Sequence, residues 1–434
     1  MRFCECMEGL KGIVIELEEK DEIGMNYYKI VQGILDIGEG MLRSGAENFR
    51  LEDSFYRMCR SYGFVKSDVF VIPSNIQVTV ETPEGEIITQ IRHVNGGEPN
   101  FDRLDYLNNL CRYVCQNTPD EKELHEKYLE VMNRPKQKRI TRYLAGIMGG
   151  AGFAVFFGSN TKDALVAVVV SILIVCVGDW LSKREDNLMV YNTLMAFMGE
   201  LIIILASRVG LADHPDRIMI GIVMLLISGL STTNGIRDIL QSDFISGFLH
   251  IMSSMLGAAG IAFGIAMALL MFHESTTDTF ILNHSVLIQL ISCTIACTGF
   301  AWWFKIRGVQ VVYSGIGAFF TWGIYVVVYA IKPSNFLATL MGAIFVAFYA
   351  FVMSRVNKAP STIFLTASVF PLIPGPNLYY LMYACVARDI SQAFGETVVL
   401  FATCLAIAVG FIIVDVVSRS IMHGMKREYH LRRM

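Results

Sequence analysis

The stretch "LIPGPNLYYLMYACVARDISQAFGE", Leu372 to Glu396, interrupts an apolar run with two prolines and a glycine. Proline removes a backbone donor and kinks a helix, and glycine weakens one. A second stretch, "LISGLSTTNGIRDILQSDFISG", Leu226 to Gly247, repeats the order Leu-Ile-x-Gly, Arg-Asp-Ile and a glycine before a long apolar run. The shared order predicts an internal duplication in which each half contains one interrupted helix.

The composition is that of a membrane protein. Of the 434 residues, 53% are hydrophobic and 17% are charged, whereas about a quarter of the residues in soluble domains are charged. Apolar runs near the ~20 residues that a bilayer requires begin only after Arg142 and recur to the end of the chain. They predict about ten membrane helices, at residues 143–158, 163–181, 189–207, 216–235, 244–272, 281–303, 309–331, 336–354, 361–386 and 395–418.

The charges of the loops orient these spans. If the N-terminus is cytoplasmic, the inner segments carry 17 Lys and Arg residues and the outer segments carry 5, which is the bias of the positive-inside rule. Five spans in each half make the second half enter the membrane from the opposite side, and inverted repeats of this kind are characteristic of secondary transporters. The sequence therefore predicts a polytopic α-helical membrane protein with two inverted five-helix repeats, 141–273 and 274–420, and cytoplasmic termini.

The two interrupted spans supply a candidate substrate pathway. Backbone groups freed at membrane depth must be satisfied by protein, water or a solute, and the small polar side chains nearby are neutral hydrogen-bond partners for a small polar solute. The candidates are Ser228, Gly229, Thr232, Thr233 and Asn234 in the fourth span, and Pro374, Gly375, Asn377 and Tyr379 in the ninth. The alternative is a pair of kinked helices that bind no ligand.

Charged residues within the spans are costly and need a reason. Glu200 lies near the middle of the third span, where burial disfavours a charged carboxylate and suits it to carrying a proton; an acid that caps a neighbouring helix is the alternative. Glu396 is expected at the outer interface. Charged residues at the ends of the interrupted spans are candidate gates for alternating access: Arg237, Asp238, Asp243, Arg388 and Asp389.

The residues before the first span predict a small cytosolic α/β domain at 25–140, after a tail at 1–24. Apolar residues at helical spacing mark helices at 30–41, 51–62 and 104–114. The segments "DVFVIP" and "IQVTVETPEGEIITQIRHV" read as strands, the last two joined in a hairpin through Pro83-Glu84-Gly85. A charged tail at 421–434 ends the chain.

Within this domain, "GEGMLRSGAENFRLED", Gly38 to Asp53, concentrates charge. Ser44 and Glu47 fit a capping box at the start of the second helix. Capping does not account for Arg50 and Glu52, which are candidates for docking the domain against the inner mouth of the pathway. Two pairs of opposite charge stand one helical turn apart, namely Glu39 with Arg43 and Asp53 with Arg57.

Together with "GIRDILQSDFISGFLHI" and "PLIPGPNLYY", this stretch resembles the threonine/serine exporter family, from about residue 26 to residue 418. The resemblance implies a bacterial plasma-membrane exporter that is driven by the proton motive force and moves threonine, serine or another small polar metabolite outward. Similar two-chain relatives are associated with dicarboxylate (succinate) export, so that alternative stays open.

Members of the family commonly have Pro-Gly where this chain has Ser228-Gly229, so the resemblance implies a weaker helix break in the fourth span than in the ninth. The family motif falls on Gly38, Glu39, Ser44, Gly45, Ala46, Glu47, Arg50, Glu52, Arg237, Asp238, Asp243 and Gly247.

Other classes of function find less support. His125-Glu126 begins an H-E-x-x-H zinc motif, but Leu129 occupies its fifth position, and a net charge of −3 argues against a nucleic-acid surface. We expect no enzyme activity, no metal and no cofactor, and reduced cysteines. The expected partners are a small-molecule substrate, protons and membrane lipid, and homo-oligomer formation is left open. A channel, or a membrane sensor with a cytosolic regulatory domain, is the alternative of another class.

Overall fold

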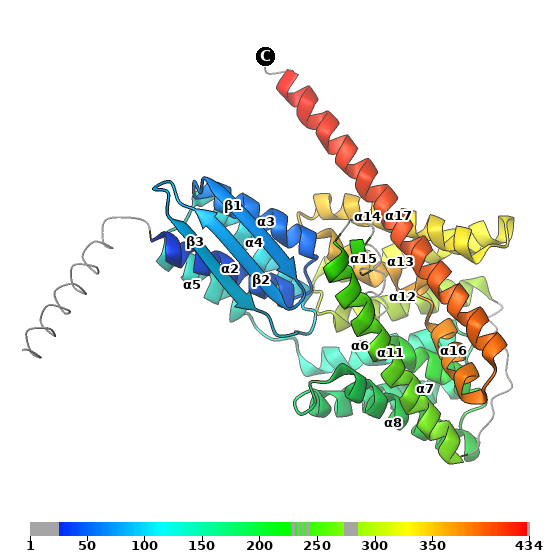
Figure 1. Ribbon diagram of the computed structural model, residues 1–434. Coiled ribbons are helices and arrows are strands. Elements are labelled where there is room, and N and C mark those ends of the chain that lie inside the picture. The colour runs from blue at the N-terminus through cyan, green and yellow to red at the C-terminus, as the bar shows by residue number, and fades with distance from the viewer. Residues whose placement is uncertain are drawn as a thin grey trace, which may run out of the picture. The chain divides into compact units, whose positions relative to one another are not determined.

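The computed structural model describes residues 26–227, 231, 235, 238, 239, 243–272 and 285–431, with residues 382, 386, 419 and 421–431 described by their backbone alone (Figure 1). The chain divides after Pro135 into two compact units. Each unit is described separately below.

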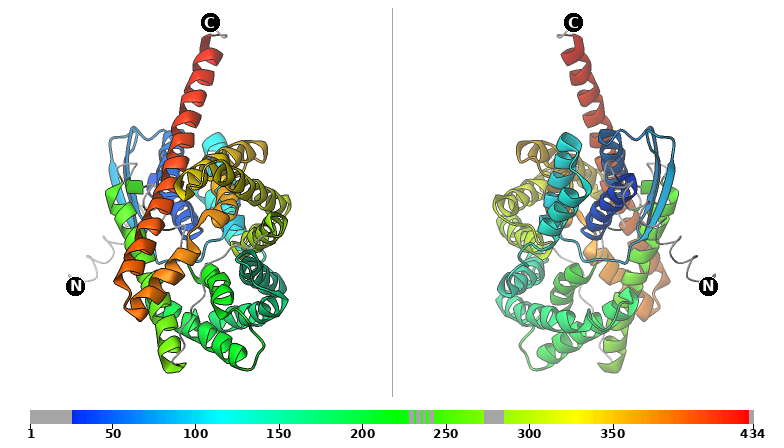
Figure 2. Two further views of the ribbon diagram at one scale, coloured as in Figure 1. Left: turned by 90° about the vertical axis from the view of Figure 1, so that its right-hand side faces the viewer. Right: turned by 90° about the vertical axis from the view of Figure 1, so that its left-hand side faces the viewer.

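The N-terminal unit is a three-stranded antiparallel sheet with its helices on one face (Figure 1, Figure 2). Side chains alternate across the sheet as the two-residue strand period requires: Ile76, Val78 and Val80 are buried, whereas Phe70 and Ile91 are exposed. The elements are α2 (Tyr27–Arg43), α3 (Asn48–Ser61), β1 (Lys66–Ile72), β2 (Asn75–Glu81), β3 (Ile87–His93), α4 (Phe101–Asn117) and α5 (Glu121–Met132). The predicted helices and strands are therefore found, and β2 and β3 form the predicted hairpin.

The core of this unit joins the helices to the sheet. Ile34 of α2, Phe55 of α3 and Leu107 of α4 are fully buried, as the helical spacing of apolar residues predicts. Gly38 lets α2 and α3 approach closely, because a Cβ atom there would overlap the ring of Phe55. A closed core of this kind makes the unit a compact body in its own right.

The second unit is a bundle of apolar helices (Figure 2). Its elements are α6 (Arg139–Phe156), α7 (Thr161–Leu181), α8 (Leu188–Arg208), α9 (Pro215–Leu226), α11 (Phe244–Phe272), α12 (Val286–Trp303), α13 (Val309–Ile331), α14 (Asn335–Val356), α15 (Ser361–Val369), η1 (Phe370–Leu372), α16 (Gly375–Ala387) and α17 (Ile390–Leu431). Within the described residues, seven helices are long and apolar enough to cross a membrane: α7, α8, α11, α12, α13, α14 and α17. The protein is therefore a multi-pass membrane protein.

Three predicted spans differ from these seven. The span at 143–158 falls on α6, which begins with the charged residues Arg139 and Arg142. The span at 216–235 falls on α9, which ends at Leu226, and the residues after it lie partly outside the described residues. The span at 361–386 is divided into α15, η1 and α16, because Pro371 and Pro374 cannot continue a regular helix.

The same helix pairs contact each other in the two halves of the bundle. In the first half α6 packs on α7, α7 on α9, α8 on α9 and α8 on α11; in the second half the pairs are α12 with α13, α13 with α15, α14 with α15 and α14 with α17. The first helices of the halves, α6 and α12, pack against each other. Small residues allow such close packing in membranes: Cβ atoms at Gly260 and Gly264 of α11 would overlap the backbone of α8 at Met189 and Thr193.

Candidate functional site

The ninth predicted span is interrupted as the sequence indicates. η1 ends at Leu372, the following Ile373 is extended, and a new helix starts at Gly375. The amide of Gly375 donates to the carbonyl of Ile373 at 2.8 Å, which closes a tight turn. The interruption therefore places a non-helical segment, with Pro374 at its centre, inside the bundle.

A cavity of about 540 Å³ lies against this interruption. Its volume falls in the range of small-molecule sites, roughly 300–1,000 Å³. Helices of both halves line it, with residues Phe156, Phe157, Val286, Gln289, Trp322, Tyr325, Val326, Tyr329, Ala330, Asn335, Thr339, Pro371, Leu372, Ile373, Pro374, Pro376, Asn377, Tyr380, Glu396, Val399 and Thr403. Of the predicted pathway residues, the structure brings Pro374 and Asn377 to this cavity.

Glu396 is the one fully charged side chain among the described residues that line the cavity. The side-chain amide of Asn377 donates to its Oε2 at 2.8 Å, and this charge-assisted hydrogen bond fixes the carboxylate in place. The structure therefore assigns Glu396 to a cavity wall, whereas the sequence placed it only at an interface. Its signal in the sequence was an acid within an apolar run directly after the interrupted span.

Aromatic rings form another wall of the cavity. Trp322, Tyr325 and Tyr329 follow one another along one face of α13, with stacked rings whose centroids are 4.5 and 6.0 Å apart. The Trp322 indole N–H donates to Gln289 Oε1 at 3.0 Å, so its ring is held in a fixed orientation. Sequence reasoning missed these residues, although their spacing of three and four along an apolar helix was visible.

A cluster of buried acids and tyrosines lies next to the cavity. Glu200 of α8 is 1% exposed and Asp216 of α9 is 2% exposed, and the two interact electrostatically. Tyr380 of α16 lines the cavity and its hydroxyl donates to Asp216 Oδ2 at 3.4 Å. Tyr379 is fully buried beside both acids and is absent from the residues that line the cavity, and its place in the substrate pathway stays a prediction.

Gly375 contacts the first half instead of the cavity. A Cβ atom on Gly375 would overlap the Sδ atom of Met224, which lies near the end of α9. Glycine at this position therefore lets α16 approach α9. Gly375 is not among the residues that line the cavity, and its place in the substrate pathway stays a prediction.

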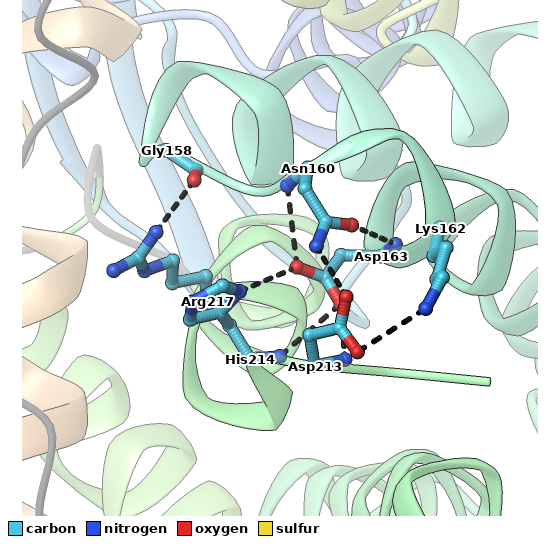
Figure 3. A network of polar contacts seen from close by, with 7 residues as sticks. All are labelled: Gly158, Asn160, Lys162, Asp163, Asp213, His214 and Arg217. Carbon is cyan, nitrogen blue, oxygen red and sulfur yellow. Dashed lines mark hydrogen bonds and ion pairs between the residues drawn. The ribbon is translucent and has the colours of Figure 1, made fainter. Parts of the chain in front are cut away.

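The loops before α7 and α9 meet in a polar network around Asp163 (Figure 3). Asp163 is fully buried, its Oδ1 accepts the backbone N–H groups of Asp213 and His214 at 2.8 and 3.2 Å, and His214 Nδ1 lies 2.9 Å from its Oδ2. The side chain of Asn160 donates to Asp213 at 2.6 Å and holds the pKa of Asp213 below its usual range. Because α9 begins one residue after His214, this network fixes the helix turn that carries Asp216.

The candidate gates have structural partners. Asp243 and Asp389 occupy the same place in the two halves, just before α11 and α17, and each accepts the amide three residues later, at Ser246 and Gln392. Both acids therefore cap the N-terminus of the long helix that follows them, and their role as gates stays a prediction. Asp238 lies 3.9 Å from His250, and Arg388 is exposed in a left-handed conformation that ends α16.

Several candidates cannot be placed. Ser228, Gly229, Thr232, Thr233, Asn234 and Arg237 lie outside the described residues. Their assignment to the substrate pathway or to a gate stays a prediction.

The stretch from Gly38 to Asp53 forms the predicted ion pairs but not the capping box. Glu39 bonds Arg43 at 3.2 Å, and Asp53 bonds Arg57 at 2.7 Å. Ser44 Oγ instead donates to the carbonyl of Gly40 at 2.6 Å and closes α2. The capping prediction is wrong because Gly45, with φ of +93°, turns the chain first, and α3 begins only at Asn48.

Arg50 and Glu52 have partners within the N-terminal unit. Arg50 Nε bonds Glu47 Oε2 at 3.0 Å, and Glu52 Oε1 accepts the backbone N–H of Val71 at 3.2 Å. Glu52 thereby ties α3 to β1, so both residues have a structural role that the sequence did not reveal. Their docking role stays a prediction.

Comparison with known proteins identifies the family of the chain. The model of the threonine/serine exporter family matches residues 32–272, and a second, described as "Threonine/Serine exporter, ThrE", matches residues 289–417. The "Threonine/serine exporter" of Corynebacterium glutamicum is 22% identical over 417 residues, which are 92% of this chain and 85% of the relative. A Mycobacterium tuberculosis protein named "Probable threonine/serine exporter" is 23% identical over 401 residues, 88% of this chain and 74% of the relative. No solved structure matches the chain. Because the first match alone spans more than half of the residues, the chain belongs to the threonine/serine exporter family.

Proposed function

We propose that this protein is a secondary transporter that exports threonine or serine across the bacterial plasma membrane in exchange for protons. The observation that carries the proposal is the charge of the cavity. Among its described lining residues, Glu396 is the one acidic or basic side chain, and the stacked aromatic rings of α13 line the same cavity.

A zwitterionic amino acid fits this chemistry. Its ammonium group is attracted by a carboxylate and by the faces of aromatic rings, here Glu396 and the rings of Trp322 and Tyr325. Its carboxylate and hydroxyl group match the neutral donors of the same cavity, which include Asn335 and Thr339. The site therefore selects a small polar molecule that carries one positive group.

A dicarboxylate fits less well. It would bring two negative charges beside Glu396, with no basic side chain among the described lining residues to compensate them, and like charges in contact are unfavourable. The chemistry of the cavity lining therefore favours threonine and serine over succinate.

The arrangement of the bundle supports alternating access. The repeated helix pairs agree with a duplication of five helices in each half, and a duplicated five-helix unit enters the membrane in opposite orientations. This inverted arrangement gives ten membrane-crossing segments, two of them interrupted, with both termini and the N-terminal unit in the cytoplasm. The charged residues at the ends of the interrupted segments, Asp243 and Asp389 among them, would act as the gates.

Proton coupling is assigned to Glu200. It is buried inside the bundle on α8, and its Oε2 atom has no hydrogen-bond partner among the described residues. A buried carboxylate without a counter-ion is far more stable with a proton. The proton motive force would then drive export through protonation and deprotonation of Glu200.

Counterflow in proteoliposomes tests the proposal. The purified full-length chain is expected to exchange labelled for unlabelled threonine and serine with saturation, and succinate is expected to compete weakly. A channel would show no saturable exchange, and a sensor would show no exchange at all. Preferred exchange of succinate would replace the amino-acid assignment with the dicarboxylate one.

A further inference from the structure

The substrate cavity has an exposed rim and a buried floor. Val286 and Tyr329, which line it, are 45% and 43% exposed, and Asn335 is exposed as well. Phe156 and Leu372 line the same cavity and are almost completely buried. The cavity therefore reaches from the surface of the bundle into its interior.

The rim lies at one end of the bundle. Val286 begins α12, Tyr329 lies in the last turn of α13, and Asn335 begins α14. In the orientation proposed above, these helix ends face the outside of the cell. The cavity is thus on the outer side of its floor, where a transported solute would be released.

Packed aromatic rings lie directly behind the floor. Phe370 immediately precedes the floor residue Pro371, and its ring stacks on that of Phe300 with centroids 4.0 Å apart. Phe153 packs edge-on against Phe300 at 5.7 Å and against the floor residue Phe156 at 5.8 Å. The rings of Phe153, Phe300 and Phe370 are buried, and these three residues are called the aromatic plug below.

The aromatic plug lies on the side of the floor away from the rim. Gln289 lines the cavity from the first turn of α12, whereas Phe300 lies about 16 Å further along this helix at a rise of 1.5 Å per residue. Phe304, just after the end of α12, packs on Phe370 with ring centroids 5.8 Å apart. The aromatic plug is therefore between the cavity floor and the end of the bundle that faces the cytoplasm in the proposed orientation.

Apolar rings beside a helix break have the properties of a gate. A polar solute would have to lose its water to pass between buried rings, so the packed rings hold the pathway closed. The contact of Phe300 with Phe370 is apolar, and stacking adds only modestly to the area that such a pair buries. Because the extended residue Ile373 directly follows η1, η1 can turn away from α12 without breaking a continuous helix.

We infer that the aromatic plug is the inner gate of the transport pathway, and that the structure is the outward-facing state in which this gate is closed. The inference rests on the proposed function and adds the place where the cytoplasmic route is blocked. To admit a solute from the cytoplasm, Phe370 must leave Phe300 and open the floor at Pro371. The gate is formed inside the bundle, apart from the charged candidates at the helix ends.

Cross-linking tests whether the two stacked rings must separate during transport. In a full-length variant that lacks the ten native cysteines, Phe300→Cys/Phe370→Cys is treated with a bifunctional methanethiosulfonate, and mass spectrometry verifies the bridge. Counterflow of threonine in proteoliposomes is expected to be lost on bridging and restored by reduction, because the bridge locks the gate closed. Full exchange by the bridged protein would show that the contact is static and would overturn the gate.

Phe345→Cys/Tyr349→Cys is the matched control. Both residues lie on α14, one helical turn apart, with ring centroids 6.0 Å apart. A bridge between them joins no separate elements, so exchange is expected to continue after the same treatment. The single variants Phe300→Cys and Phe370→Cys are expected to retain exchange after treatment as well.

A second measurement needs neither substrate nor the double cysteine. Val399→Cys, in the same background, places one thiol in the cavity. An impermeant maleimide is expected to label it from outside the cell but not from the cytoplasmic face of inside-out vesicles. Adding Phe370→Ala should raise labelling from the cytoplasmic face by about tenfold or more, since the minor state of such an equilibrium is populated at roughly 0.1–10%.

The labelling results separate the gate from the proposed function. Labelling of Val399→Cys from the cytoplasmic face while the aromatic plug is intact would overturn the outward-facing state. Unchanged cytoplasmic labelling after Phe370→Ala, in a protein with the wild-type elution volume, would overturn the gate. Labelling as expected, together with no exchange of any amino acid, would overturn the proposed function alone.

Discussion

At the scale of single residues, the pair of Asn377 and Glu396 carries the acidic group of the proposed substrate cavity. The two side chains come from different helices, α16 and α17, and meet at 2.8 Å. The amide donates one hydrogen bond and leaves the negative charge of the carboxylate in place. The charge is thus held at a defined point of the wall, where an ammonium group can reach it.

We expect Glu396→Gln to raise the KM for threonine by about tenfold or more, because a hydrogen bond to a charged group contributes roughly 1.5–3 kcal/mol. Glutamine still accepts from Asn377, so the variant removes the charge and preserves the shape. Concentration-dependent counterflow measures the effect. Asp415→Asn, on the same helix but not among the cavity residues, should leave the KM unchanged. An unaltered KM in Glu396→Gln would remove the ammonium site.

The sequence identified some of the site residues and could not identify others. Pro374 and Asn377 were predicted because proline and glycine inside an apolar run can be recognised from the sequence alone. Tyr379 and Tyr380 are neighbours in sequence, but successive residues on a helix differ by about 100° in direction. Tyr380 lines the cavity and Tyr379 does not, and this difference depends on which helices pack around α16.

At the scale of elements, the interruption between η1 and α16 sets how closely the halves meet. Gly375 starts α16 against Met224 of α9. The contact has no room for a methyl group. The position of α16, and with it the position of Tyr380, therefore depends on this glycine.

We expect Gly375→Ala to lower stability by about 1–3 kcal/mol, the usual cost of overpacking a filled core. Met224→Ala in the same chain should restore much of the loss, because it removes the atom that the new methyl group would meet. Thermal unfolding in detergent of both single variants and the double variant measures this coupling. Gly395→Ala, where a Cβ atom would meet open space, is the control. Additive losses in the double variant would contradict the close contact.

The helix boundaries were predictable where apolar length alone decides them. The spans expected at 244–272 and 309–331 coincide with α11 and α13, because each apolar run is continuous. In the runs at 216–235 and 361–386 the sequence predicts an interruption but not the residue where the helix stops, since hydropathy does not change inside an apolar segment. α17 extends beyond its apolar part to Leu431, because charged residues also form helix.

At the scale of the whole molecule, the order of helix contacts bears on how the chain crosses the membrane. The loop between α8 and α9 and the loop between α14 and α15 occupy corresponding places in the two halves. If the repeat is inverted, these loops lie on opposite sides of the membrane. If it is not, they lie on the same side.

Single cysteines at these loops distinguish the two arrangements. Leu211 and Lys358 are both exposed. Each is replaced singly by cysteine in a variant that lacks the ten native cysteines and still exchanges substrate. We expect Leu211→Cys to react with an impermeant maleimide on intact cells, and Lys358→Cys to react only after the membrane is opened, because the positive-inside rule places Lys358 in the cytoplasm. Lys162→Cys, in the first turn of α7, should react like Leu211→Cys. Labelling of Lys358→Cys on intact cells would show that the two halves are parallel, and alternating access between inverted halves would then be excluded.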